Sequence, residues 1–209
     1  MKERPILFNA EMVRAVLDGR KTQTRRLVKL SEFSASDTPG YDFHFLGTRR
    51  GGKGYLWQDM TIQQIMNLCP FGQGSRLWVR EAWRASSAHD NLPPREIPIG
   101  DAIEYLADDS ISHLTGKKRH SMFMPRWACR ITLEITDVRL HRLQEISESD
   151  AMDEGAGATG PLHAEWDGDP DKYRKRFREL WDSINTKPSP FRFCSNPWVW
   201  AVSFEVVRG

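Results

Sequence analysis

The sequence predicts a mixed α+β fold in which a small sheet or barrel is flanked by isolated helices. Two segments, 129–136 and 198–206, alternate their side chains with the period of two that is typical of strands. Helical patterns lie between the strands without the regular alternation of a parallel α/β sheet. A chain of 209 residues can bury a substantial core, so we expect one domain over 1–209.

The first helix is expected over residues 10–18. Asn9 has a side chain suited to cap its N-terminus, and Gly19 stands where a left-handed residue commonly ends a helix. An extended segment follows as far as Val28. Residues 31–56 are rich in Ser, Asp, Gly and Arg, which indicates a long surface loop or a loose hairpin.

The middle of the chain predicts a short helix, a strand and a polar excursion. Thr61 can cap a helical turn over 62–68, and a glycine-rich turn then leads into an aromatic strand that ends near Trp83. Residues 84–122 are polar and are expected to leave the core without forming a second domain. Their basic run Lys117-Lys118-Arg119-His120 could touch phosphate, although a solvated loop explains it more simply.

Two helices are expected between the two long strands. Ser147 and Asp150 have the spacing of a capping box, which predicts a short helix that ends at Gly155. Asp169 followed by Pro170 predicts the cap and the first residue of a longer helix. The apolar residues of that helix recur at helical spacing, and most of its cations face elsewhere, which indicates an exposed basic face.

The overall charge gives little information about partners, but its distribution is uneven. The chain has 30 Lys and Arg against 28 Asp and Glu, a net charge of +2. Residues 1–30 carry eight basic and three acidic side chains, whereas residues 144–182 carry five basic and eleven acidic ones. One end is suited to meet anions, and two solvated faces of opposite sign are the alternative explanation.

Cysteine usage and hydropathy indicate a cytoplasmic protein. The three cysteines, Cys69, Cys129 and Cys194, are sparse and form no CxxC pair, which favours a reducing compartment over a disulfide framework. The N-terminus lacks the apolar run of a signal peptide, and no apolar segment is long enough to span a bilayer. We therefore expect no membrane partner.

Several common catalytic architectures lack their motifs in this chain. Six histidines are scattered singly, without HExxH or a His/Cys pairing, so no metal site is expected. No Walker loop, GxGxxG or GxSxG is present, which argues against the commoner nucleotide-hydrolysing and acyl-transfer architectures. We expect neither a metal nor a cofactor.

The segment GRKTQTRR, from Gly19 to Arg26, is the most distinctive chemical feature. It places Lys21 and Thr24 three residues apart among other cations. Because like charge disfavours protonation, the Lys21 pKa could fall far enough for the amine to act as a base beside a hydroxyl. The preceding helix C-terminus attracts cations and opposes this effect. A basic surface loop that binds phosphates is the alternative interpretation.

A carboxylate would complete a proton path with Lys21 and Thr24. The candidates are one residue at the end of the aromatic strand and four on the short acidic helix: Glu81, Glu148, Asp150, Asp153 and Glu154. Spacing does not choose among them. Of the eight tryptophans, Trp83 is our candidate for a pocket wall against which a base could stack. Three others fit core patterns: Trp181, Trp198 and Trp200.

Five segments, taken in order, resemble the ASCH-domain family, above all its longer members from bacteriophages and prophages. These segments are GRKTQTRR, GQGSRLWVREAW, PRWACRITLEITDVRLHRL, ISESDAMDEGA and NPWVWAVSFEVV. The resemblance covers essentially the whole chain, with 31–60 and 84–122 as variable excursions. It implies a PUA-like fold, in which a small β-barrel is flanked by helices, with polar loop insertions.

The resemblance implies three kinds of function. The first is an amidohydrolase acting on an acylated pyrimidine nucleoside such as N4-acetylcytidine, because a bacterial enzyme of that kind has a similar G-R-K-T-x-T-x-R motif. The match implies catalytic roles for Lys21, Thr24 and Glu154, with Asp153 as the alternative to Glu154. The second is a module that binds RNA or single strands, and the third is a metal-independent ribonuclease.

Each function assigns roles to the motif residues. In the amidohydrolase, Thr24 would attack or position water, Lys21 would shuttle the proton, and Glu154 would orient the amine or activate water. In the binding module, Lys21 and three arginines would meet phosphates: Arg20, Arg25 and Arg26. Glu81 and Trp83 complete the candidate binding residues. The expected partner is a modified nucleoside or RNA.

The chain also departs from the small amidohydrolase. It is about twice as long, Gln23 replaces the short apolar residue between the two threonines, and Arg25 is added. These changes could close, widen or repurpose the pocket. The substrate of the small enzyme is therefore not implied for this chain.

Overall fold

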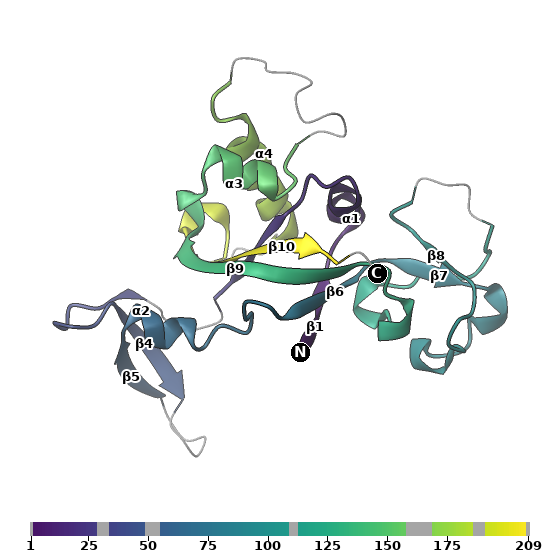
Figure 1. Cartoon of the computed structure of the whole chain (residues 1–209), viewed down its shortest axis with the longest axis horizontal. Coiled ribbons are helices and arrows are strands. Elements are labelled where there is room, and N and C mark those ends of the chain that lie inside the picture. The colour runs from purple at the N-terminus through teal and green to yellow at the C-terminus, as the bar shows by residue number, and fades with distance from the viewer. Residues whose placement is uncertain are drawn as a thin grey trace.

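The computed structural model describes residues 2–28, 34–48, 55–108, 113–157, 169–185 and 191–207 (Figure 1). These residues form a mixed α+β structure, which confirms the predicted class. The strands are β1 Glu3–Leu7, β2 Gln23–Leu27, β3 Ser34–Ala35, β4 Phe43–Thr48, β5 Tyr55–Met60, β6 Arg76–Arg80, β7 Trp83–Ala85, β8 Ile103–Tyr105, β9 Thr132–Arg142 and β10 Trp198–Val206. The α-helices are α1 Ala10–Leu17, α2 Ile62–Met66, α3 Glu148–Asp153 and α4 Lys172–Ile184.

The main sheet has five strands in the order β1-β6-β9-β10-β2. Strands β1 and β6 are parallel, whereas the other neighbours are antiparallel. The long strands β9 and β10 pair along almost their whole lengths and share an irregularity between Ser203 and Phe204. The described strands do not close into a barrel, because no ladder joins the edge strands β1 and β2.

The strand over 198–206 is confirmed, but the strand expected over 129–136 begins later and runs longer. A 3₁₀ turn over Arg126–Ala128 precedes it, and the Cys129 amide donates to the Arg126 carbonyl oxygen at 3.1 Å. Cys129 therefore ends a turn, and the strand starts at Thr132. The alternating side chains of β9 and β10 pack into one core with residues of β1, α1 and β6.

Local capping signals fix three of the helices. Asn9 accepts from the Met12 amide at 2.8 Å, and Gly19 has a φ of 72°. The capping boxes begun by Thr61 and Ser147 are both present. The fourth helix is a correction, because α4 starts at Lys172, and the Asp169 carboxylate instead accepts from the Asp171 amide in the turn before it.

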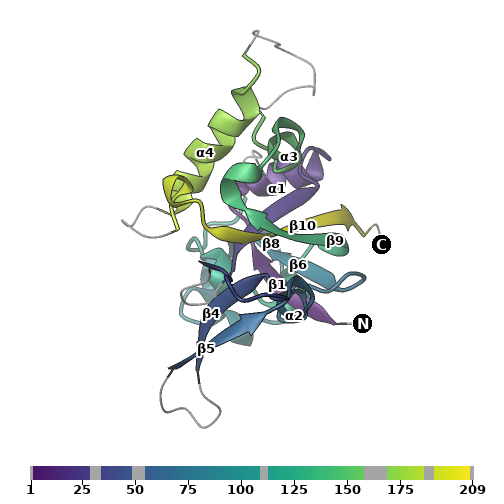
Figure 2. The same cartoon turned by 90° about the vertical axis from the view of Figure 1, so that its left-hand side faces the viewer.

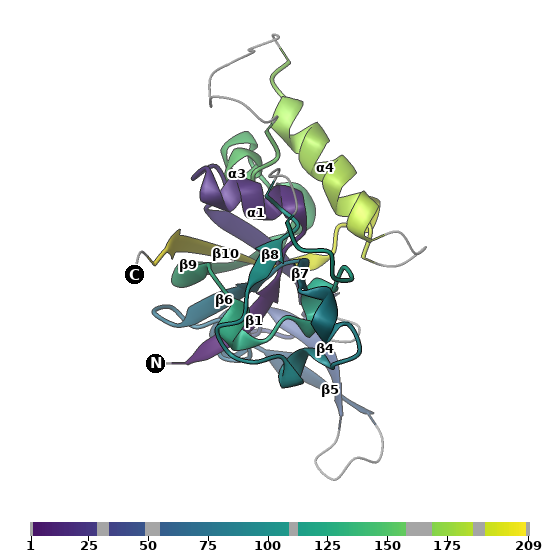
Figure 3. The ribbon, with the colours of Figure 1, turned by 90° about the vertical axis from the view of Figure 1, so that its right-hand side faces the viewer.

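Two sets of short strands extend from the main sheet. Described residues of the first excursion form a three-stranded sheet, β3-β4-β5, which matches the loose hairpin expected there. The second pairs β7 with β8 and has a small apolar cluster of its own. Helices α1, α3 and α4 lie together on one side of the main sheet, and the β4–β5 hairpin lies at the opposite end of the molecule (Figures 1 and 2). Figure 3 views the molecule from the side of β7 and β8.

Candidate active site

The candidate site forms where the start of β2 meets the end of α3. Lys21 and Glu154 face each other across an isolated β-bridge. The Lys21 ammonium donates to the Glu154 carboxylate at 2.8 Å, to the Glu154 carbonyl oxygen at 2.8 Å and to the Gln23 carbonyl oxygen at 2.9 Å. These three bonds use all three protons of the ammonium. Lys21 is 1% exposed and Glu154 is 4% exposed, so the ion pair is shielded from water.

Gly155 allows the two segments to approach this closely. Its φ is 79°, in the left-handed region that favours glycine. A Cβ atom at this position would lie 2.9 Å from the Cβ of Ala15 and 3.2 Å from the Cβ of Lys21. The glycine that ends α3 therefore also provides the space in which Lys21 reaches Glu154.

Burial is the first cause of the lowered pKa of Lys21. It disfavours the charged amine, the Glu154 carboxylate opposes it, and Arg26 and Arg25 lower the pKa further. The sequence identified the arginines as a cause of this shift but not the larger effect of burial. Lys21 follows the C-terminus of α1 as expected, and its ammonium also binds the carbonyl oxygen of Glu154, the C-cap residue of α3. A second helix end therefore favours the charged amine.

Arg25 holds the other side of the same carboxylate. Its guanidinium donates to Glu154 Oε1 at 3.2 Å and to the side-chain oxygen of Gln23 at 2.7 Å, and it pairs with Asp150 at 3.2 Å. Lys21 binds Oε2, so each carboxylate oxygen of Glu154 contacts one cation. Arg25 is 1% exposed. The site is therefore a buried network of charge-assisted contacts.

The alternation of strand β2 separates Thr24 from the ion pair. Lys21 and Arg25 lie on one face, whereas Thr24 and Arg26 lie on the other. The Thr24 hydroxyl accepts from Arg26 at 2.9 Å, and a second Arg26 nitrogen donates to the Leu7 carbonyl oxygen at 3.1 Å. In the described part of the chain, neither Lys21 nor Glu154 hydrogen-bonds Thr24. The three predicted catalytic groups thus divide into a bonded pair and a hydroxyl that holds Arg26.

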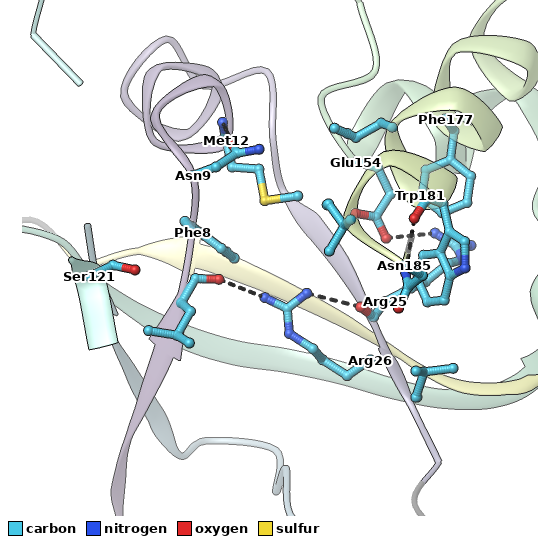
Figure 4. A pocket seen from close by; sticks show the side chains of 14 residues that line it. Phe8, Asn9, Met12, Arg25, Arg26, Ser121, Glu154, Phe177, Trp181 and Asn185 are labelled. Carbon is cyan, nitrogen blue, oxygen red and sulfur yellow. Dashed lines mark hydrogen bonds and ion pairs between the residues drawn. The ribbon is translucent and has the colours of Figure 1, made fainter. Parts of the chain in front are cut away.

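A pocket of about 390 Å³ adjoins these residues (Figure 4). Arg25 and Arg26 both line this pocket, so it receives side chains from both faces of edge strand β2. Its polar lining includes Arg25, Arg26 and Glu154. The Phe8 ring lies beside the cations, with its centre 5.5 Å from the Lys21 Nζ and 5.6 Å from the Arg26 Cζ. The other lining residues are Leu7, Asn9, Met12, Leu27, Ser121, Phe177, Leu180, Trp181, Ile184 and Asn185.

The remaining sequence candidates lie elsewhere. Arg20 pairs with Asp18 at 2.8 Å, and Asp153 contributes its carbonyl oxygen to the Thr22 amide. Glu81 is paired with Arg130 and does not line the pocket. Burial raises the pKa of Glu81, and the contact with Arg130 opposes that rise.

Trp83 does not form a wall of this pocket, contrary to the expectation from the sequence. Its side chain is fully buried in the apolar cluster of the second excursion, where it meets the Trp127 ring edge-on with ring centres 6.4 Å apart. The aromatic walls of the pocket are instead Phe8 on β1's C-terminal side and Phe177 and Trp181 on α4. No local signal marks these residues as neighbours, although the helical spacing of Phe177 and Trp181 does indicate one shared face.

Metal-binding clusters and membrane-spanning helices are both absent from the described residues. These residues contain no group of three or more His, Cys, Asp or Glu side chains placed to hold a metal ion. They also contain no helix with the length and apolar character needed to cross a membrane. The three cysteines are free.

Comparison with known proteins does not assign a family. No family model matches the chain, and no curated protein matches it. A crystal structure of a protein from Enterococcus faecalis, described by the family model DUF984, aligns with 93% of this chain at 12% sequence identity and a TM-score of 0.40. The chain spans 65% of the length of that protein.

Proposed function

We propose that this protein is an amidohydrolase that removes an acyl group from a modified pyrimidine nucleoside of the N4-acetylcytidine type. The observation that carries the proposal is the buried Lys21–Glu154 pair whose carboxylate lines an apolar pocket. Pockets of roughly 300–1,000 Å³ hold small ligands, and a volume of about 390 Å³ suits a nucleoside-sized molecule. The aromatic lining suits a planar base.

The proposal includes membership of the ASCH family and its PUA-like fold. Supporting it, Arg26 on edge strand β2 donates to the Leu7 carbonyl oxygen at the end of edge strand β1. This contact links the two edges that a barrel would bring together. The GRKTQTRR motif lies at the same place, so the family resemblance and the pocket concern the same residues.

Amide hydrolysis at this site needs a base, an oxyanion stabiliser and a proton for the leaving nitrogen. Glu154 accepts a proton from water as the water oxygen attacks the acyl carbon. The Arg26 guanidinium, held by Thr24 and Leu7, stabilises the negative oxygen of the tetrahedral intermediate. The carbon–nitrogen bond then breaks, the proton passes to the leaving nitrogen, and the products are a carboxylic acid and the free amine.

Lys21 and Thr24 have different roles in this scheme. Lys21 hydrogen-bonds the Glu154 carboxylate and has a pKa lowered by burial, so it can exchange a proton with that carboxylate during the reaction. Thr24 is a positioning residue, because its hydroxyl accepts the hydrogen bond that orients Arg26. This assignment differs from a direct attack by Thr24 and follows from the alternation of β2.

Burial of the cations makes the phosphate-binding interpretation of this motif weaker. Lys21 and Arg25 are 1% exposed, and Arg20 is paired with Asp18. A nucleic-acid backbone meets cations at a surface, where they can replace its counterions. Arg26 is half-buried and lines the pocket. A guanidinium in this position suits a bound small group better than a strand of phosphates.

The test is turnover of N4-acetylcytidine by the purified protein, with cytidine and acetate measured by chromatography. Lys21→Met should lower kcat/KM by at least about 100-fold, the lower end of typical general acid–base effects. Lys172→Met is the matched control, because Lys172 is also a buried lysine but lies at the start of α4, outside the Lys21–Glu154 pair. Failure of the folded protein to hydrolyse any member of a panel of N4-acylated cytidines would contradict the proposal.

A further inference from the structure

A second hollow, of about 500 Å³, lies in the second excursion. We call it the basic groove, and its lining residues are Asn91, Leu92, Pro93, Pro94, Lys117, Lys118, Arg119, His120 and Phe123. A 3₁₀ turn over Ser121–Phe123 forms the boundary between the two hollows. Ser121 lines the first hollow, whereas His120 and Phe123 line the second. The segment His120–Phe123 therefore contributes residues to both hollows and is the wall that they share.

The lining of the basic groove is cationic, with no carboxylate among the described residues that form it. Lys118 and His120 are exposed at its surface. Lys117 is anchored by the Asp90 carbonyl oxygen. Arg119 is buried and donates to the carbonyl oxygens of His89 and Leu92, so it braces the groove from within. This arrangement leaves cationic groups at the surface and fixes the backbone beneath them.

The wall between the hollows also presents an aromatic ring to solvent. Phe123 is 55% exposed, and its neighbour Met122 is 54% exposed. The turn that carries them is held in place, because Arg80 donates to the Met122 carbonyl oxygen at 3.0 Å. An exposed aromatic ring beside cations is the combination with which proteins bind single-stranded nucleic acid, through base stacking and phosphate contacts.

We propose that the acylated base reaches the pocket as part of a single-stranded polynucleotide that continues along the basic groove. This inference rests on the proposed function for the occupant of the first pocket. The strand crosses the Ser121–Phe123 turn, an adjacent base stacks on Phe123, and phosphates lie at Lys118 and His120. Figure 4 shows Ser121 on the side of the pocket opposite Phe177 and Trp181. The base would lie between these two sides, and the polynucleotide would leave the pocket past Ser121.

The test measures binding separately from turnover. Fluorescence anisotropy with a fluorescein-labelled single-stranded RNA of about six nucleotides, within the usual range of site sizes, gives the affinity at several salt concentrations. The Lys118→Ala/His120→Ala double variant should weaken binding at least about tenfold and reduce the salt slope by about 0.7 for each phosphate that the variant no longer neutralises. Phe123→Ala should weaken binding at least about fivefold, because the adjacent base then has no ring on which to stack.

Arg95→Ala is the matched control, because Arg95 is an exposed cation of the same excursion that lines neither hollow. It should bind the RNA like the wild type. Equal affinity of the wild type and the double variant would overturn the groove, as would cytidine 5′-monophosphate competing as well as the RNA. RNA binding without hydrolysis of an acetylated RNA would uphold the groove and contradict the proposed function. Hydrolysis of free N4-acetylcytidine without RNA binding would uphold the proposed function and overturn the groove.

Discussion

The molecule contains two runs of cations that look alike in the sequence and differ completely in their surroundings. The run at 20–26 enters edge strand β2, and two of its cations are almost fully buried. The run at 117–120 lies in the second excursion and leaves Lys118 and His120 at the surface. The first run lies against an acidic helix, α3, whereas the second runs beside backbone carbonyl oxygens and prolines.

The difference shows that acceptors, rather than local charge, decide where a cation can be buried. Lys21 has three acceptors, and Arg25 contacts two carboxylates and the Gln23 side chain. Burying an unpaired charge is far more costly than burying one that is paired and hydrogen-bonded. The first run therefore suits chemistry in a shielded pocket, and the second suits contact with a solvated anion.

The largest loss of stability is expected when Lys21, in the buried run, is replaced. Lys21→Met removes one of the two cations that contact the buried Glu154 carboxylate, and removal of one member of a buried pair typically costs about 3–5 kcal/mol. Urea denaturation measures the loss in the free energy of unfolding. The Lys21→Met/Glu154→Gln double variant removes both charges and should recover part of the loss. Additive losses in the two single variants and the double variant would show that the pair is not coupled.

A smaller loss is expected at Gly155. Gly155→Ala places a methyl group 2.9 Å from the Ala15 Cβ and imposes a left-handed conformation on alanine, and each of these effects costs about 1–3 kcal/mol. Gly40→Ala is the control, since Gly40 also has a positive φ but has open space at its Cβ position. Thermal denaturation should show the larger loss for Gly155→Ala. Equal losses would mean that the approach of Lys21 to α3 tolerates the extra atom.

The contribution of Asp150 to the stability of the buried network should depend on pH. Burial raises the pKa of Asp150, but the hydrogen bond from Arg139 and the charge of Arg25 outweigh it, so its pKa lies below the ordinary value of 3.8. Its contribution to stability is therefore present above pH 3.8 and is lost as the pH falls through the folded-state pKa. Asp150→Asn should lose less stability than the wild type between neutral and acidic pH in urea denaturation. An unchanged pH profile would contradict this ionic role.

The smallest expected effect is at the exposed run. Lys118→Ala should change the free energy of unfolding by no more than about 0.5 kcal/mol, because exposed substitutions away from special contacts rarely do more. The same denaturation experiment as for Lys21→Met measures it. A loss comparable to that of Lys21→Met would remove the contrast between the two runs.

Local features of the sequence predicted the elements well. Asn9, Gly19 and the Ser147–Asp150 capping box act within one turn of a helix, so their positions follow from nearby residues alone. The start of α4 could not be placed as well, because Asp169 and Asp171 are both plausible caps and the carboxylate of Asp169 is used in the preceding turn.

The site itself was only partly accessible from the sequence. The catalytic hypothesis placed Lys21 and Thr24 together, although the period of two in an extended segment separates Thr24 and Arg26 from Lys21 and Arg25. The contact of Lys21 with Glu154 joins residues 133 positions apart, and no local pattern encodes it. The same holds for Phe177, which meets Arg25 through the packing of α4 beside α3, and for Phe8, which meets Lys21 from the end of β1. The closure of the predicted barrel stays a prediction.

The most direct test of the central claim is the kcat/KM of Glu154→Gln on N4-acetylcytidine, measured beside the wild type at matched folded fractions. Glutamine keeps the size and the hydrogen-bonding oxygen of the side chain but cannot accept a proton from water. We expect kcat/KM to fall by about 100-fold or more. A Glu154→Gln variant that hydrolyses the substrate within about twofold of the wild-type rate would show that Glu154 is not the base.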